Sequence, residues 1–407
     1  MTLSAIWNRF PRQYWLMFFG MLISTIGASM IWPFQMIYIT SRLGLPLATV
    51  ATLSTINAAA GIVSSFIGGP ITDRAGRKWV MVISLAVNGL VYLFMSQATT
   101  YWHFALLMLL GGAFNPLYRL AADAMMADLV PPKDRTDGYS IFRMSNNLGL
   151  SLGPTIGGFI AASSYDRAFF IGAAGMVIYS VMIAVMARET LPSRDPSSIP
   201  VRERFGGYDA VIADRKYISF VGTFTLVTMC ASIMWVLLSV YTNQNFGLSE
   251  RQYGFIPATN AIMVVLLQVL VTQFTKRRNP LWMVALGGLL YAIGAGSVAL
   301  GTGFWGFWSA MVIMTFGELI LVPVSSTYIA NLAPADKRAR YMSLYALTWP
   351  VANGIGPLMG GLLNDHLGPP FIWVGAGLFG LLGAIGYAIQ ARRQTRASTD
   401  PQIDPAL

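Results

Sequence analysis

Charged residues are scarce in this chain. Asp, Glu, Lys and Arg make up 11% of its 407 residues, whereas hydrophobic residues make up 55%. A soluble domain carries roughly 25% charged residues, so this chain has too few to cover a water-facing surface. The runs 14–40, 79–96 and 287–300 are nearly free of charge, and a membrane-spanning helix needs about 20 such residues. Lipid leaves unpaired backbone groups without partners. The composition therefore predicts an all-α membrane protein with many spans.

Cysteine and histidine are nearly absent as well. The only cysteine, Cys230, excludes an intrachain disulfide, and the two histidines have no cluster of further ligands around them in the sequence. We therefore expect no metal site. Walker, H-E-x-x-H and H-x-x-x-x-D patterns are missing too, so the sequence does not favour a membrane-embedded enzyme. A transporter, a receptor and a non-transporting scaffold remain.

Twelve spans are predicted from the apolar runs. They cover approximately residues 13–40, 47–71, 79–98, 102–129, 138–162, 167–188, 217–244, 251–275, 281–301, 304–330, 340–364 and 369–391. A Pro-, Ser- and charge-rich stretch, 189–216, is typical of a linker. It separates an N-terminal six-helix bundle, 1–188, from a C-terminal one, 217–391, with a tail over 392–407.

The positive charge is distributed unevenly over this map. Most of the 27 Lys and Arg fall in the linker, the tail and the loops on one side of the predicted membrane. The positive-inside rule makes that side cytoplasmic and places both termini there, in a bacterial inner membrane. The net charge of +10 is thus explained by topology and by anionic lipid headgroups, and no nucleic-acid partner is expected.

The two halves repeat. A shift of 203 residues places "ADLVPPKDRTDGYS" on "ANLAPADKRARYMS", "GPTIGG" on "GPLMGG", and Arg74 and Trp79 on Arg277 and Trp282. Each match alone is weak, but one shift serves all of them. We therefore predict two homologous bundles related by an axis along the membrane normal.

The stretch between the second and third predicted spans, "GGPITDRAGRKWVM", carries the most specific motif. The chain resembles members of the major facilitator superfamily, whose signature G-x-L-a-D-r-x-G-r-k is matched here by a set of charged residues and glycines. These are Gly69, Ile71, Asp73, Arg74, Gly76, Arg77 and Lys78. The resemblance covers essentially the whole chain and implies twelve helices in two pseudo-symmetric bundles.

A conformational latch is expected at this motif. Gly76 offers a flexible backbone for a short turn, and Asp73 can face the positive N-terminus of another helix. The resemblance implies that this helix is the eleventh span and that the arginines reach Asp128, which closes the fourth span. These contacts would break when the cytoplasmic side opens. An ordinary positively charged turn is the alternative.

A second motif lies in the fifth predicted span. "GLSLGPTIGG" resembles the g-x-x-x-G-P-x-x-G-G pattern of the antiporter branches of the same superfamily. Its matching residues are Gly149, Gly153, Pro154, Gly157 and Gly158. Glycines also serve helix packing.

Polar side chains recur every four residues within several spans, which places them on one helical face. Because ionisable groups in a membrane usually line a cavity, we expect a water-accessible cleft that binds substrate. Its predicted residues are Gln35, Asn115, Arg119, Arg143, Asn147, Trp235, Asn260 and Trp349.

Two acids are candidates for proton coupling. Glu318, the repeat-mate of Asn115, falls near the middle of the tenth span, and a carboxylate in a low-dielectric cleft can exchange a proton near neutral pH. A structural carboxylate is the alternative. Asp123 can either act as a proton site or pair with Arg119, and Arg143 can pair with Asp123 or with Asp128.

Two features depart from the drug:proton antiporter pattern. The arginine of the fourth helix would fall at Leu107 or Met108, and the first span has no acid. The sequence nevertheless favours a monomeric, proton-coupled exporter of lipophilic or amphipathic small molecules, driven by the proton gradient without a cofactor. An uptake or facilitative carrier for sugars, organic anions or lipids is the alternative on the same fold.

Overall fold

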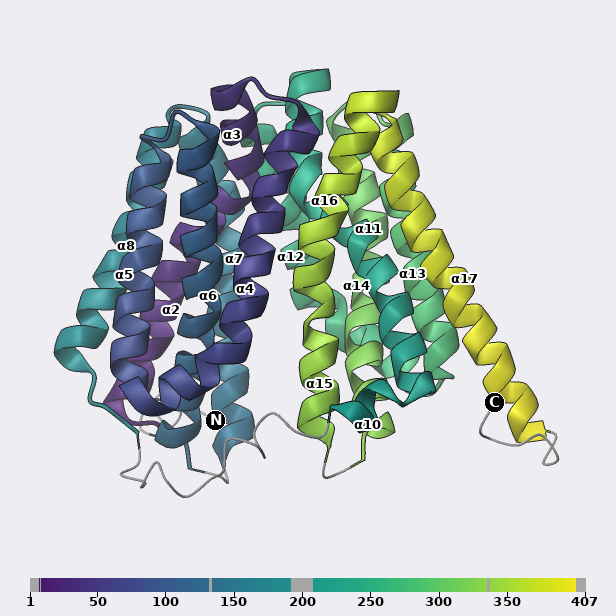
Figure 1. Cartoon of the computed structure of the whole chain (residues 1–407), viewed down its shortest axis with the longest axis horizontal. Helices are drawn as coiled ribbons and strands as arrows, with labels where there is room; N and C mark the ends of the chain where they lie inside the picture. The colour runs from purple at the N-terminus through teal and green to yellow at the C-terminus, as the bar shows by residue number, and fades with distance from the viewer. Residues whose placement is uncertain (1–6, 8, 132–133, 192–207, 335–336, 400–407) are drawn as a thin grey trace. The chain divides into compact units, whose positions relative to one another are not determined.

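The computed structural model describes residues 7, 9–131, 134–191, 208–334 and 337–399. The chain forms two compact units, Met1–Ser198 with Gly247–Ala261 and Ile199–Phe246 with Ile262–Leu407. Each unit consists of long helices that run roughly side by side (Figure 1).

The first unit follows the first half of the sequence. Its helices are α2 (Arg12–Ile31), the 3₁₀ turn η1 (Trp32–Phe34), α3 (Gln35–Leu43), α4 (Leu47–Ala75), α5 (Arg77–Met95), α6 (Tyr101–Leu129), α7 (Arg135–Ala161) and α8 (Tyr165–Met186). A buried cluster that includes Tyr14, Met81, Met125 and Tyr179 joins α2, α5, α6 and α8 near one end of the unit.

The second half of the sequence is also helical throughout its described part. It contains α10 (Asp209–Ile212), α11 (Arg215–Phe246), α12 (Glu250–Thr275), α13 (Pro280–Ser297), the 3₁₀ turn η4 (Val298–Leu300), α14 (Phe304–Leu332), α15 (Arg338–Ala346), α16 (Thr348–Leu367) and α17 (Phe371–Thr399). Residues of α12 up to Ala261 group with the first unit, and the remainder groups with the second.

The helices agree closely with the predicted spans. Ten segments of the described chain are long and apolar enough to cross a membrane, and α7 and the α15–α16 pair occupy the positions of the fifth and eleventh spans. Two spans differ from the single helices expected. The first is interrupted by the 3₁₀ turn around Pro33, since proline cannot donate the backbone hydrogen bond of a regular helix. The eleventh divides at Leu347.

The internal repeat is visible in matching tertiary hydrogen bonds. The hydroxyl of Tyr14 donates to the carbonyl of Gly138, and the hydroxyl of Tyr217 donates to the carbonyl of Tyr341. Both pairs of positions are related by the shift of 203 residues.

A second pair of bonds obeys the same shift. Arg135 donates to the carbonyl of Ala127 at 3.0 Å, and Arg338 donates to the carbonyl of Ala330 at 3.0 Å. We call these four bonds the paired fasteners. They show that the two halves share local geometry as well as sequence.

The glycine motif of the fifth span brings α7 close to α2. A Cβ on Gly149 would lie 2.7 Å from Cβ of Thr25, and one on Gly157 would overlap the backbone of Met30. Gly153 faces Ser29 in the same way, and Pro154 and Gly158 are buried. The motif residues of α7 therefore make close helix packing possible, whatever further role they have.

Candidate functional site

The sharp turn between α4 and α5 follows from one glycine. Gly76 has a φ of 87°, a conformation that residues with a Cβ rarely adopt. It ends α4 and allows α5 to start at Arg77 without an intervening loop. The signature motif thus lies across a helix–helix turn, as its glycine predicted.

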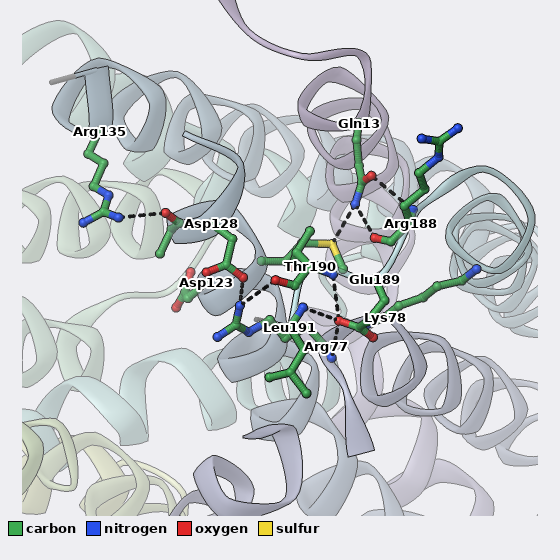
Figure 2. A network of polar contacts seen from close by, with 12 residues as sticks. Gln13, Arg77, Lys78, Asp123, Asp128, Arg135, Arg188, Glu189, Thr190 and Leu191 are labelled. Carbon is green, nitrogen blue, oxygen red and sulfur yellow. Dashed lines mark hydrogen bonds and ion pairs between the residues drawn. The ribbon is translucent and has the colours of Figure 1, made fainter. Parts of the chain in front are cut away.

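The first turn of α5 is capped by an acid from far along the chain. Glu189 follows the end of α8, and its carboxylate accepts hydrogen bonds from the backbone N–H groups of Arg77 and Lys78, each at 3.0 Å (Figure 2). A helix N-terminus has unsatisfied N–H groups and a partial positive charge, so a carboxylate is well suited to it. A Cβ on Gly76 would collide with this carboxylate, which gives the glycine a second purpose.

Glu189 also orders the residues that follow it. Its Oε1 accepts from the backbone N–H of Thr190 at 2.8 Å and of Leu191 at 3.0 Å. Partial burial acts to raise the pKa of the Glu189 carboxyl, but these backbone donors and those of α5 outweigh it and lower the pKa below its ordinary value. The group is therefore ionised at neutral pH.

Arg77 connects the same turn to the end of α6. Its guanidinium forms an ion pair with Asp128, and Nη1 lies 3.4 Å from the carbonyl of Thr190 (Figure 2). The two charged side chains are only 12% and 24% exposed. The contact implied by the family resemblance is thus present, whereas its role as a latch stays a prediction.

The side chain of Gln13 forms two hydrogen bonds with the backbone just after the end of α8. The Gln13 side chain of α2 donates to the carbonyl of Arg188 at 2.8 Å and accepts from its N–H at 3.1 Å (Figure 2). We call Gln13, Arg77, Asp128 and the segment 188–191 the polar junction. It joins the same ends of α2, α5, α6 and α8 within the first unit.

Other motif residues have different surroundings. Asp73 and Arg74 are exposed and form no ion pair within the described chain, and Gly69 faces open space. The ammonium of Lys78 lies 5.4 Å from the ring centre of Trp79. The helix that Asp73 was expected to face belongs to the other unit, so its predicted role stays a prediction.

A polar face runs along α6. Asn115, Arg119 and Asp123 are all exposed, as their spacing predicted. Arg119 is near enough to act electrostatically on Asp123, but the two form no ion pair within 4 Å in the part of the chain that is described. Charged groups on a spanning helix are costly against lipid, so this face favours water.

The predicted residues of α7 and α3 differ in exposure. Arg143 is exposed and forms an ion pair with neither Asp123 nor Asp128 among the described residues. Asp128 is paired with Arg77 instead. Asn147 is half-buried. The amide of Gln35 donates to the sulfurs of Met95 and Met108 at 3.4 and 3.2 Å, so it lies inside the first unit.

Glu318 is the central residue of α14, a 29-residue helix. It is half-buried and lies near the buried Tyr291 of α13. The preceding Gly317 allows α14 to approach α13, since a Cβ there would lie 2.7 Å from the carbonyl of Gly287. Glu318 is thus held at mid-span beside a close helix crossing.

Helix α12 contributes polar side chains next to Glu318. Gln268 donates to Thr272 at 3.1 Å and to the carbonyl of Leu319, next to Glu318, at 3.1 Å. Asn260 is buried, Trp235 is half-buried and Trp349 is exposed. Within the second unit, Gln268 and Thr272 therefore form a polar pair beside Glu318.

Two residues of the polar junction were missed by sequence reasoning. Glu189 appeared only as the first residue of a linker, and Gln13 as the start of the first span. A signal for Glu189 exists, because "ARETLP" places an isolated acid, preceded by Arg188, just beyond the end of an apolar run. Nothing in the sequence pattern points to the partners of Gln13, which are the backbone of Arg188 and the sulfur of Met125.

Comparison with known proteins gives consistent results. A model of the Major Facilitator Superfamily matches residues 17–220 and 220–405. The Na⁺, Li⁺, K⁺/H⁺ antiporter of Planococcus maritimus is 24% identical over 81% of this chain and 84% of its own. The multidrug resistance protein MdtH of Shigella sonnei is 24% identical over 94% and 96%.

A solved structure shows the same fold. The crystal structure of the nucleoside transporter NupG superposes with a TM-score of 0.80 at 11% identity, covering 92% of this chain and 99% of the other.

Proposed function

The chain belongs to the Major Facilitator Superfamily and is a multi-pass membrane transporter, and on that premise we propose that it is a proton-coupled antiporter. Its substrates would be lipophilic or amphipathic small molecules, exported across a bacterial cytoplasmic membrane. The names of two relatives, a multidrug resistance protein and a cation/H⁺ antiporter, support efflux coupled to protons. Alternating access of the two bundles is the mechanism that such a duplicated architecture supports.

One observation carries the proposal: an acid at the centre of a spanning helix. Glu318 is half-buried at mid-span in α14. An ionised carboxylate within a membrane span has a high free-energy cost, and such groups usually have a functional role. Its neighbours include the buried Tyr291 and the carbonyl of Leu319, which is bonded to Gln268. Binding of substrate and binding of a proton at Glu318 would then exclude each other, so that arrival of substrate would release the proton. Movement of one charge across 100 mV supplies about 2.3 kcal/mol.

Inorganic cation/H⁺ exchange is a second candidate. It is favoured by the antiporter from Planococcus maritimus, which covers 81% of the chain. Arg119 and Arg143 are exposed, and their positive charge argues against a cation site at their own positions. The same charge would suit an anionic substrate, which is consistent with the alternative of a carrier for organic anions. Asp123 offers a carboxylate on the same face.

The test uses the full chain in proteoliposomes with an imposed pH gradient. Uptake of amphipathic cations, neutral lipophilic dyes, Na⁺ and K⁺ is recorded together with proton release. We expect Glu318→Gln to abolish gradient-driven movement of an amphipathic substrate while the protein stays folded. Asp365→Asn, at the exposed end of α16, is the matched control and should transport normally.

The outcomes separate the candidates. Full coupled transport by Glu318→Gln would reject Glu318 as the coupling acid. Proton release that follows only Na⁺ or K⁺ would favour cation exchange, and substrate movement that ignores the pH gradient would favour a facilitative carrier.

A further inference from the structure

The turn between α12 and α13 carries three consecutive cations, Lys276, Arg277 and Arg278. They line an open hollow of about 690 Å³ together with Leu270, Gln273 and Phe274. The hollow thus has a cationic side and an apolar side, and it lies wholly within the second unit.

The turn is held in place by hydrogen bonds at both ends. The N–H of Lys276 donates to the carbonyl of Thr272 at 3.1 Å, and that of Arg278 donates to Thr275 at 3.0 Å. Asn279 then caps α13 by accepting from the N–H of Leu281 at 3.0 Å. The cations are therefore presented from a fixed backbone, which lowers the entropic cost of binding an anion.

The Arg278 side chain is positioned as well. Its guanidinium carbon lies 4.0 Å from the centre of the Phe274 ring, a distance typical of a cation–π contact. This contact links the charged group to the apolar side of the hollow.

An exposed apolar stripe leads along α12 to the same hollow. Its side chains recur at helical spacing and are between 51% and 67% exposed. They are Ile262, Val265, Leu266, Val269, Leu270 and Phe274. A hydrocarbon chain laid on this stripe would end at Lys276–Arg278.

The corresponding turn in the first half neutralises its own charge. There Arg77 pairs with Asp128, and Glu189 caps α5. The shift of 203 residues replaces these two acids by Asn331 and Arg392. Within the described residues, no carboxylate forms an ion pair with the three cations of the α12–α13 turn.

We propose that the α12–α13 turn binds the phosphate headgroup of an anionic phospholipid, with an acyl chain along the stripe of α12. The cations supply the charge that a phosphodiester requires, and guanidinium groups suit phosphate geometry. Basic clusters next to the end of a spanning helix are typical of recognition of anionic lipid. The stripe explains why a lipid, rather than free phosphate, would be retained.

Native mass spectrometry of the full chain tests this site. The protein is titrated with phosphatidylglycerol or with phosphatidylcholine, and bound lipids are counted. We expect Lys276→Gln/Arg277→Gln/Arg278→Gln to weaken retention of phosphatidylglycerol by about tenfold or more and to leave phosphatidylcholine unchanged. The control Arg215→Gln/Lys216→Gln/Arg396→Gln removes the same charge from exposed positions on α11 and α17 and should change retention less than about twofold.

Three results would overturn the proposal. Equal losses in the two triple variants would show diffuse attraction without a site. Displacement of the lipid by millimolar inorganic phosphate would identify a free-anion site, and equal affinity for the two lipids would remove the role of charge. Thermal unfolding of both triple variants checks that they are folded. If the first is not, the single Arg277→Gln variant must still show a graded loss.

Discussion

The carboxylate of Glu189 lies 3.0 Å from the backbone nitrogen of Lys78, 111 positions earlier in the chain. This bond connects the segment after α8 to the first turn of α5. The helix end supplies N–H groups that have no partner within the helix, and Glu189 supplies a negative charge, which the helix dipole favours there. The end of the sixth span is thereby tied to the signature motif.

Removal of this charge should destabilise the first unit. Glu189→Gln keeps the shape of the side chain but replaces one acceptor oxygen by a donor that faces N–H groups. We expect a loss of about 1 kcal/mol, kept small because the group is partly in water. Thermal unfolding in detergent measures it. Arg188→Gln is the matched control, since only the backbone of Arg188 is bonded in the polar junction, and an equal loss in both variants would contradict the assignment.

The same bond predicts a dependence on pH. The pKa of Glu189 is lowered in the folded protein from its ordinary value of 4.5. Its contribution is therefore fully present above that value and is lost as the pH falls through the lowered pKa. We expect the stability difference between wild type and Glu189→Gln to be constant at neutral pH and to shrink in acid. A difference that persisted at the lowest pH with a folded protein would speak against an ionised cap.

The ion pair between Arg77 and Asp128 should show measurable coupling. The two side chains are 12% and 24% exposed, so solvent screens the pair less than it would a fully exposed pair. A double-mutant cycle with Arg77→Gln and Asp128→Asn is expected to give a coupling energy of about 1–2 kcal/mol. The exposed Arg74 provides the control, because a cycle of Arg74→Gln with Asp128→Asn should give a value near zero.

The glycines of α7 and α4 predict opposite effects of one methyl group. Gly157→Ala would force apart the backbones of α7 and α2 at Met30, and overpacking of this kind costs about 1–3 kcal/mol. Gly69→Ala meets open space within α4, so it should stabilise the helix by up to about 1 kcal/mol. Thermal unfolding compares the two, and similar shifts would contradict the packing role of the glycine motif.

The fold was largely predictable because its main signals are periodic. Long apolar runs set the spans, and one constant shift revealed the duplication that the paired fasteners now display. Gly76 was predictable too, since only glycine readily takes a positive φ at so tight a turn. The break at Pro33 had a local cause that a hydropathy average does not register. The division of the eleventh span at Leu347 has a similar local cause, because Pro350 has no N–H to donate to the carbonyl of Ala346, the last residue of α15.

The candidate site was less predictable, for a physical reason. Glu189 accepts from backbone N–H groups, and Gln13 bonds to the backbone of Arg188 and the sulfur of Met125. Every residue has backbone groups, so such partners leave no trace in the sequence. Polar faces such as Asn115–Arg119–Asp123 were found because helical spacing is regular. The surroundings of Gln35 were not, because methionine sulfurs far apart in the sequence receive its hydrogen bonds.

The paired fasteners have a consequence for how the protein unfolds. Tyr14 and Arg135 secure helices within one half, and Tyr217 and Arg338 secure those of the other. Neither set of bonds includes a residue of the other half. We therefore expect heating or denaturant to unfold the two bundles as separate cooperative units. A calorimetric trace would then contain two overlapping transitions, and a substitution in one bundle would displace only one of them.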